Sequence, residues 1–122
     1  MKVPLNFTVN GEERHLEIEP RRTLLEVLRE DLILTGARRG CEENFCGGCT
    51  VLLDGLAVHS CSVLAVQAGG REVSTIEGLA IDGRLHPLQE AFVEHGAIQC
   101  GYCTPGMVMS ALAFLSKNPR PT

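Results

Sequence analysis

Apolar and polar residues alternate over the first part of the chain. The alternating apolar positions are Val3, Leu5, Phe7, Val9, Leu16 and Ile18. A period of two places every second side chain on the same face of a β-strand. Asn10-Gly11 separates the two alternating runs, and this pair is a preferred two-residue hairpin turn. The pattern therefore predicts an N-terminal β-hairpin.

The next segment changes from a period of two to helical spacing. Thr23 is followed three residues later by Glu26, which is the signature of a capping box at a helix start. The apolar residues at helical spacing are Leu24, Leu25, Val27, Leu28 and Leu32. We therefore expect a helix that ends before Gly36.

Between residues 36 and 48 the periodicity disappears, and the glycine content predicts a loop. The apolar run Thr50–Leu53 and the turn pair Asp54-Gly55 predict a second hairpin. After the Gly69-Gly70 turn, Glu72–Ile76 is a candidate final strand. A hairpin, a crossing helix and further strands in this order suit a β-grasp sheet.

The remainder of the chain has helical character. Pro87 can occupy the first turn of a helix that runs to Val93, and Pro105 can do the same for Thr104–Leu115. The connection at residues 79–85 contains an Asp-Gly turn and marks the boundary. We expect an α+β protein with a strand-rich unit at 1–79 and a helical unit at 80–122.

Composition and charge narrow the function classes. With 122 residues, 44% hydrophobic and 21% charged, the chain can fold as one domain or two small ones. The net charge of −4 does not favour nucleic acid as a partner. The N-terminus lacks a basic stretch followed by an apolar run, and no segment is long enough to span a bilayer. We therefore expect a cytoplasmic chain without a membrane span.

Six cysteines carry the strongest chemical signal. Cys41, Cys46 and Cys49 form C-x4-C-x2-C, the plant-type spacing for a 2Fe-2S cluster, and Cys61 follows as the separate fourth ligand. In a reducing compartment thiolates bind metal more often than they form disulfides. The spacing predicts one 2Fe-2S cluster on these four residues.

Glycines and acidic residues surround these cysteines. Gly40, Gly47 and Gly48 permit tight turns and let backbone N–H groups approach the cluster sulfurs. Glu42 and Glu43 would lower the reduction potential if they lay beside the cluster, although a solvated loop face is the simpler interpretation.

Two other uses of the cysteines remain open. A structural zinc site could combine Cys46-x2-Cys49 with Cys100-x2-Cys103, but these pairs lie much farther apart than in ordinary zinc ribbons. Disulfides are the weakest alternative, because nothing in the spacing suggests a small secreted scaffold.

Four stretches resemble a known family. They are G-C-E-E-N-F-C-G-G-C-T-V-L-L-D-G from Gly40, H-S-C at His59 to Cys61, L-H-P-L-Q-E-A-F at Leu85 to Phe92, and Q-C-G-Y-C-T-P-G-M at Gln99 to Met107. They resemble the small iron-sulfur subunit of the xanthine dehydrogenase family, the molybdenum hydroxylases, which includes bacterial carbon monoxide, nicotinate and aldehyde dehydrogenases. The resemblance covers nearly the whole chain.

The resemblance implies a plant-type ferredoxin-like β-grasp domain followed by a four-helix 2Fe-2S domain. It implies that Cys100 and Cys103 bind a second cluster near the molybdenum cofactor, and that Gln99 hydrogen-bonds the pterin of that cofactor. Family members carry a further cysteine pair, and this sequence stops before it. We therefore expect a C-terminally truncated helical domain and no stable second cluster from these residues alone.

The implied function is electron transfer within an oxidoreductase. A molybdopterin-binding large catalytic subunit would supply electrons, and an FAD-binding medium subunit would receive them. No nucleophile or acid-base pair is visible in the sequence, which fits a subunit without a substrate-binding active site. A free-standing ferredoxin shuttle and a zinc-stabilised interaction module are the alternatives.

Several polar side chains have simpler interpretations. The residues alone favour a helix-start role for Gln99, and only the resemblance implies a cofactor contact. His59, His86 and His95 lie among polar or turn residues and are expected to have structural or solvent-facing roles. A Rieske-like use of His86 or His95 as cluster ligands is disfavoured because that motif is missing.

Overall fold

The N-terminal alternation forms the predicted hairpin. The computed structural model describes residues 1–41 and 46–120. Strand β1 (Val3–Val9) pairs antiparallel with β2 (Glu12–Ile18). Asn10 and Gly11 have φ of 51° and 84°, as a type I′ turn requires. Leu5, Phe7 and Val9 of β1 are buried, so the predicted face of this strand is confirmed.

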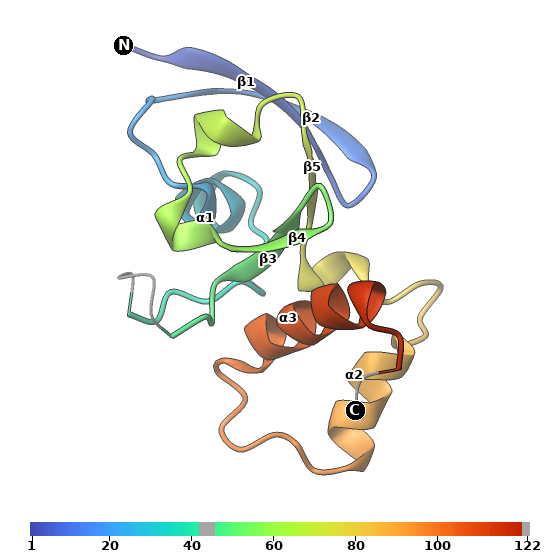
Figure 1. Cartoon of the computed structure of the whole chain (residues 1–122). Helices are drawn as coiled ribbons and strands as arrows, with labels where there is room; N and C mark the ends of the chain where they lie inside the picture. Colours follow the sequence, from blue (N-terminus) through green and yellow to red (C-terminus); the bar gives the residue numbers. More distant parts are fainter. Residues whose placement is uncertain (42–45, 121–122) are drawn as a thin grey trace.

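In the part of the chain that the structure describes, five strands make one mixed sheet (Figure 1). Strands β3 (Thr50–Leu53) and β4 (Leu56–His59) form the second predicted hairpin. Strand β5 (Glu72–Ser74) lies between the hairpins, parallel to β1 and antiparallel to β3. The strand order is β2-β1-β5-β3-β4. The predicted strand Glu72–Ile76 is too long, because the chain turns into a 3-10 helix, η4, at Ile76–Gly78.

The predicted helix begins at its capping box and ends earlier than its apolar pattern. Helix α1 (Leu24–Glu26) is capped by Thr23, whose Oγ1 accepts from Glu26 N at 3.1 Å. It continues as a π-helical turn, η1 (Val27–Asp31), in which Leu32 N donates to the Val27 carbonyl at 3.1 Å. Val27 and Leu28 of this turn are fully buried in the core, whereas Glu30 and Asp31 are exposed.

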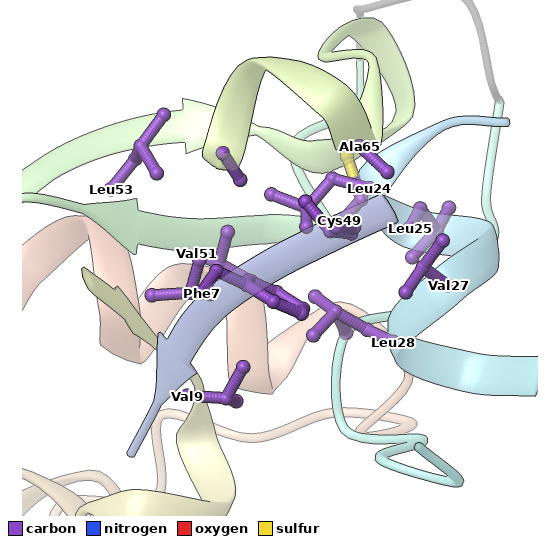
Figure 2. Packing of buried hydrophobic residues seen from close by; sticks show 14 of the residues in the cluster. Phe7, Val9, Leu24, Leu25, Val27, Leu28, Cys49, Val51, Leu53 and Ala65 are labelled. Atoms are coloured by element: carbon purple, nitrogen blue, oxygen red, sulfur yellow. The ribbon is translucent and has the colours of Figure 1, made fainter. Parts of the chain in front are cut away.

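The main core lies between the sheet and this helix (Figure 2). Its largest fully buried side chains include Leu5, Ile18, Leu24, Leu25, Leu28, Val51 and Val73. Two 3-10 helices, η2 (Ser60–Ser62) and η3 (Ala65–Ala68), run beside α1 and complete this core. Ala65 and Ala68 are fully buried within it.

Within the described residues, two α-helices follow the sheet and contact each other at a steep angle (Figure 1). Helix α2 (Pro87–Glu94) has no buried residue, whereas α3 (Thr104–Lys117) packs on β3. Because side chains alternate along a strand, β3 turns Val51 into the main core and Leu52 towards α3. Leu52, Met109 and Ala113 form a second, small core. The α+β class is thereby confirmed.

Within the described residues, no helix is both long and apolar enough to cross a membrane.

Candidate iron-sulfur sites

Cys41 and Cys46 face each other across the loop that precedes β3. The Cys46 backbone N–H donates to Cys41 Sγ at 3.1 Å, and the Cys41 backbone N–H donates to Cys46 Sγ at 3.5 Å. Gly48 N also donates to Cys46 Sγ, at 3.4 Å. The backbone thus directs N–H groups at both sulfurs, as expected where thiolate charge must be stabilised.

Cys49 and Cys61 form a second, more buried pair. Cys49 immediately precedes β3 and is 3% exposed, and Cys61 lies in η2. The Ser60 hydroxyl donates to the Cys49 carbonyl at 2.6 Å, which holds the two segments together. Burial raises the pKa of the Cys49 thiol, and a hydrogen bond from the Cys61 backbone opposes this rise. The neighbouring Cys61 thiol raises the Cys49 pKa further.

Glycine is required where the loop passes closest to the sulfurs. A Cβ at Gly40 would lie 2.5 Å from Cys46 Sγ, which is closer than a carbon atom can approach. Gly47 has a φ of +75°, a conformation that other residues rarely adopt. Close approach of the backbone to sulfur therefore accounts for the glycine at Gly40 and the positive φ accounts for Gly47, whereas a Cβ at Gly48 would meet its neighbours at an ordinary 3.7 Å.

The donor set fits a two-iron cluster. A 2Fe-2S centre takes four thiolates, two on each iron, and the described cysteines here gather as Cys41 with Cys46 and Cys49 with Cys61. Over residues 1–41 and 46–120, no group of three or more His, Cys, Asp or Glu side chains is placed to hold one ion. None of the six cysteines, all of them described, forms a disulfide.

Cys100 and Cys103 form a separate pair in the turn before α3. Both are exposed; Tyr102 N donates to Cys100 Sγ at 3.5 Å, and the Cys103 thiol contacts Met107 Sδ at 3.7 Å. A hollow of about 380 Å³ lies over this turn. Gln99 is exposed and lines the same hollow, so it lies beside the cysteine pair.

Sequence reasoning missed three residues that contact the backbone of the loop before β3, namely Thr50, Tyr102 and Gly106. Tyr102 and Gly106 connect the two groups of cysteines, whereas Thr50 bonds Gly47 within the first group. The only sequence signal for two of them is their position inside the stretch C-G-Y-C-T-P-G. No periodicity indicates that this stretch touches residues some sixty positions earlier.

The histidines have the structural surroundings expected of them. His86 caps α2 by accepting from Leu88 N at 3.0 Å, and His95 ends the same helix. His59 lies beside the first cysteine loop, because its Nε2 is 3.7 Å from the position of a Cβ at Gly47. Glu42 and Glu43 lie outside the described residues.

Cys41, Cys46 and Cys49 in a glycine-lined loop, with Cys61 beside it in η2, supply the four thiols that an iron-sulfur protein needs for a 2Fe-2S cluster. Two protein families match the chain. The 2Fe-2S iron-sulfur cluster binding domain matches residues 7–75, and the 2Fe-2S binding domain matches residues 75–122.

Related proteins show which kind of iron-sulfur protein the chain resembles. The nicotinate dehydrogenase small FeS subunit of Eubacterium barkeri is 50% identical over 99% of this chain and 77% of its own length. The nicotine 6-hydroxylase small subunit of Paenarthrobacter nicotinovorans is also 50% identical, over 99% of this chain and 73% of its own. The aldehyde oxidoreductase iron-sulfur-binding subunit PaoA of Escherichia coli K12 is 47% identical over 94% of this chain and 50% of its own.

A solved structure agrees with these relatives. A chain of quinoline 2-oxidoreductase from Pseudomonas putida 86 superposes with a TM-score of 0.96 at 45% identity, over 99% of this chain and 75% of that one. The chain belongs to the family of small 2Fe-2S subunits of molybdenum hydroxylases. It is an electron-transfer component of an oxidoreductase.

Proposed function

We propose that this chain holds one 2Fe-2S cluster on Cys41, Cys46, Cys49 and Cys61. Through it, single electrons would pass from a molybdenum cofactor on a large partner subunit towards FAD on a medium subunit. The observation that carries the proposal is the pairing of Cys41 with Cys46 and of Cys49 with Cys61, in and beside one loop. Four cysteine thiolates are the ligand set of a plant-type cluster.

The cluster supplies a one-electron carrier, and the chain's own residues control its surroundings. Backbone N–H groups of Cys41, Cys46 and Gly48 donate to the ligand sulfurs. Burial of Cys49 keeps water from one side of the site. Hydrogen bonds to sulfur and solvent exposure are the main means by which a protein sets such a reduction potential.

We further propose a plant-type β-grasp domain at 1–79 and the first part of a four-helix-type domain at 80–122. The strand order β2-β1-β5-β3-β4, with one helix packed across the sheet, supports the first assignment. The two family matches meet at residue 75, close to the proposed boundary.

Cys100 and Cys103 are proposed as two ligands of a second cluster, and Gln99 as a contact to the pterin cofactor of the large subunit. The support is their shared, exposed hollow beside α3. With six cysteines in the 122 residues, four at the first site leave two at the second. The remaining two ligands would have to come from outside these residues.

The test is iron and acid-labile sulfide quantitation with visible and paramagnetic resonance spectra on the reconstituted chain. We expect about two irons per chain, lost in Cys49→Ser and retained in the matched variant Cys103→Ser. A colourless zinc-binding chain would refute the cluster. Four irons with two paramagnetic signals would refute the division of the cysteines into a complete and a half site.

A second experiment separates the relay from a free-standing ferredoxin. The chain is purified from its native cells under gentle conditions, and co-purifying subunits are assayed for molybdenum and FAD. We expect both cofactors at fixed ratios to the chain. Isolation of the chain alone, with no molybdenum at any stage, would support the shuttle instead.

A further inference from the structure

The first turn of α3 lies directly on the first cysteine loop. A Cβ at Gly106 would overlap the Gly47 carbonyl oxygen and lie 3.0 Å from Gly48 Cα. Gly106 is buried, although it is at the start of a helix whose neighbouring residue Met107 is 47% exposed. The helix can reach the loop only because this position has no side chain.

The contacted atoms belong to one peptide group. Its oxygen, on Gly47, accepts from Thr50 N at 3.1 Å and from Thr50 Oγ1 at 2.7 Å. Its N–H, on Gly48, donates to Cys46 Sγ at 3.4 Å. Because a peptide group is planar and rigid, a displacement or rotation of the oxygen also changes the position of the N–H relative to the sulfur. A change in the contact between α3 and this peptide therefore changes the hydrogen bond from Gly48 N–H to Cys46 Sγ.

Tyr102 contacts the other side of the same loop. Its hydroxyl donates to the Arg39 carbonyl at 2.6 Å, and the Arg38 guanidinium carbon lies 5.7 Å from the centre of its ring. Arg38 N in turn donates to the Gly48 carbonyl at 2.9 Å. Tyr102 thus holds the Arg38-Arg39 segment, which is hydrogen-bonded to the Gly47-Gly48 segment.

We propose that Gly106 and Tyr102 are positioning residues for the first cluster, although they lie in the helical unit and beside the other cysteine pair. Gly106 lets α3 seat against the Gly47-Gly48 peptide, and Tyr102 ties Arg38-Arg39 to the same helix start. Together they hold the Gly48 N–H on Cys46 Sγ. This inference rests on the proposed cluster at Cys41, Cys46, Cys49 and Cys61.

The physical consequence is a dependence of the first cluster's reduction potential on α3. Reduction adds negative charge to the cluster, and an N–H group directed at a ligand sulfur stabilises that charge. Loss of the Gly48 N–H contact therefore makes the potential more negative. A role confined to packing would change the stability of α3 and leave the potential unchanged.

The test compares Gly106→Ala with Ser110→Ala, which lies one turn along α3 and is exposed. The midpoint potential and the paramagnetic resonance spectrum of the first cluster are measured in the full chain. We expect a more negative potential and an altered spectrum in Gly106→Ala, and no change in Ser110→Ala. Equal potentials in the two variants, with the cluster retained, would overturn the proposal.

Milder variants keep the test decisive if Gly106→Ala does not fold. Tyr102→Phe removes only the hydroxyl that bonds Arg39, and Thr50→Val removes only the side-chain bond to the Gly47 oxygen. We expect both to shift the potential in the same direction as Gly106→Ala, by smaller amounts. Unchanged potentials in both would refute the inference. Absence of any cluster in the unaltered chain would instead refute the proposed function.

Discussion

The strand-rich part and the helical part of this chain differ sharply in how much apolar surface they bury. The first part encloses large side chains such as Leu5, Leu24 and Val73 at 1% exposure or less. In the second part α2 buries none of its residues, and Val93 and Phe114 are 63% and 53% exposed. The loop that carries Cys41, Cys46 and Cys49 therefore lies beside a well-packed core. The second thiol pair depends on the contact of α3 with β3 and with that loop.

The largest expected effect is in the main core. Leu28 is fully buried between the helix and the sheet (Figure 2). Leu28→Ala should lower the free energy of unfolding by roughly 2–5 kcal/mol through lost burial and a residual cavity. The measurement is urea unfolding of the cluster-loaded chain, followed by far-ultraviolet circular dichroism. A decrease in the free energy of unfolding of less than about 1 kcal/mol would mean that neighbouring side chains close the cavity left by Leu28→Ala.

The small core beneath α3 provides the next test. Met109 is 1% exposed against Leu52 and Ala113, which are each 8% exposed. Met109→Ala should cost about 2 kcal/mol, at the low end for such a truncation, because this small site can partly close. Hydrogen exchange should show lost protection in α3 and unchanged protection in β1. Equal loss in both elements would contradict the separation of the two parts.

The capping box at the start of α1 gives a smaller, pH-dependent effect. Thr23→Ala should cost about 1 kcal/mol; Thr35→Ala, at an exposed position, is the control. The Thr23 backbone N–H donates to Glu26 Oε1 at 3.0 Å and, as the largest cause, holds the pKa of Glu26 below its usual range.

The sign of the pH dependence follows from that lowered pKa. The Glu26 contribution is fully present above the unfolded-state pKa and is lost as pH falls through the lower folded-state pKa. Unfolding midpoints of the unaltered chain and of Glu26→Gln should therefore converge in acid. A gap that stays constant from neutral to acidic pH would refute this.

The smallest effect is expected on the exposed face of α2. Val93→Ala should change the free energy of unfolding by no more than about 0.5 kcal/mol, since little apolar area is lost and alanine favours the helix. The matched variant is Val27→Ala, at a position that is fully buried in the main core. That change should cost roughly 1.5 kcal/mol or more from lost burial alone. Similar losses at the two positions would contradict the comparison of the two parts.

The sequence by itself determined the local elements. The Asn10-Gly11 turn, the Thr23 capping box and the helix started by Pro105 each depend on residues within four positions of one another. Such short-range preferences act in any context, so they can be read without a structure. The spacing C-x4-C-x2-C is local too, so the first cluster site could be predicted from it, and glycines line the loop that carries these cysteines.

Tertiary structure decided the rest. The π-helical turn at Val27–Asp31 was not predicted, because the apolar pattern of this segment is equally compatible with an ordinary α-helix. The approach of Gly106 to Gly47 and of Tyr102 to Arg39 joins segments about sixty residues apart. These contacts exist because both faces of β3 are covered, one by the main core and the other by α3. No short sequence pattern encodes such docking, since it depends on the summed burial of residues from the whole chain.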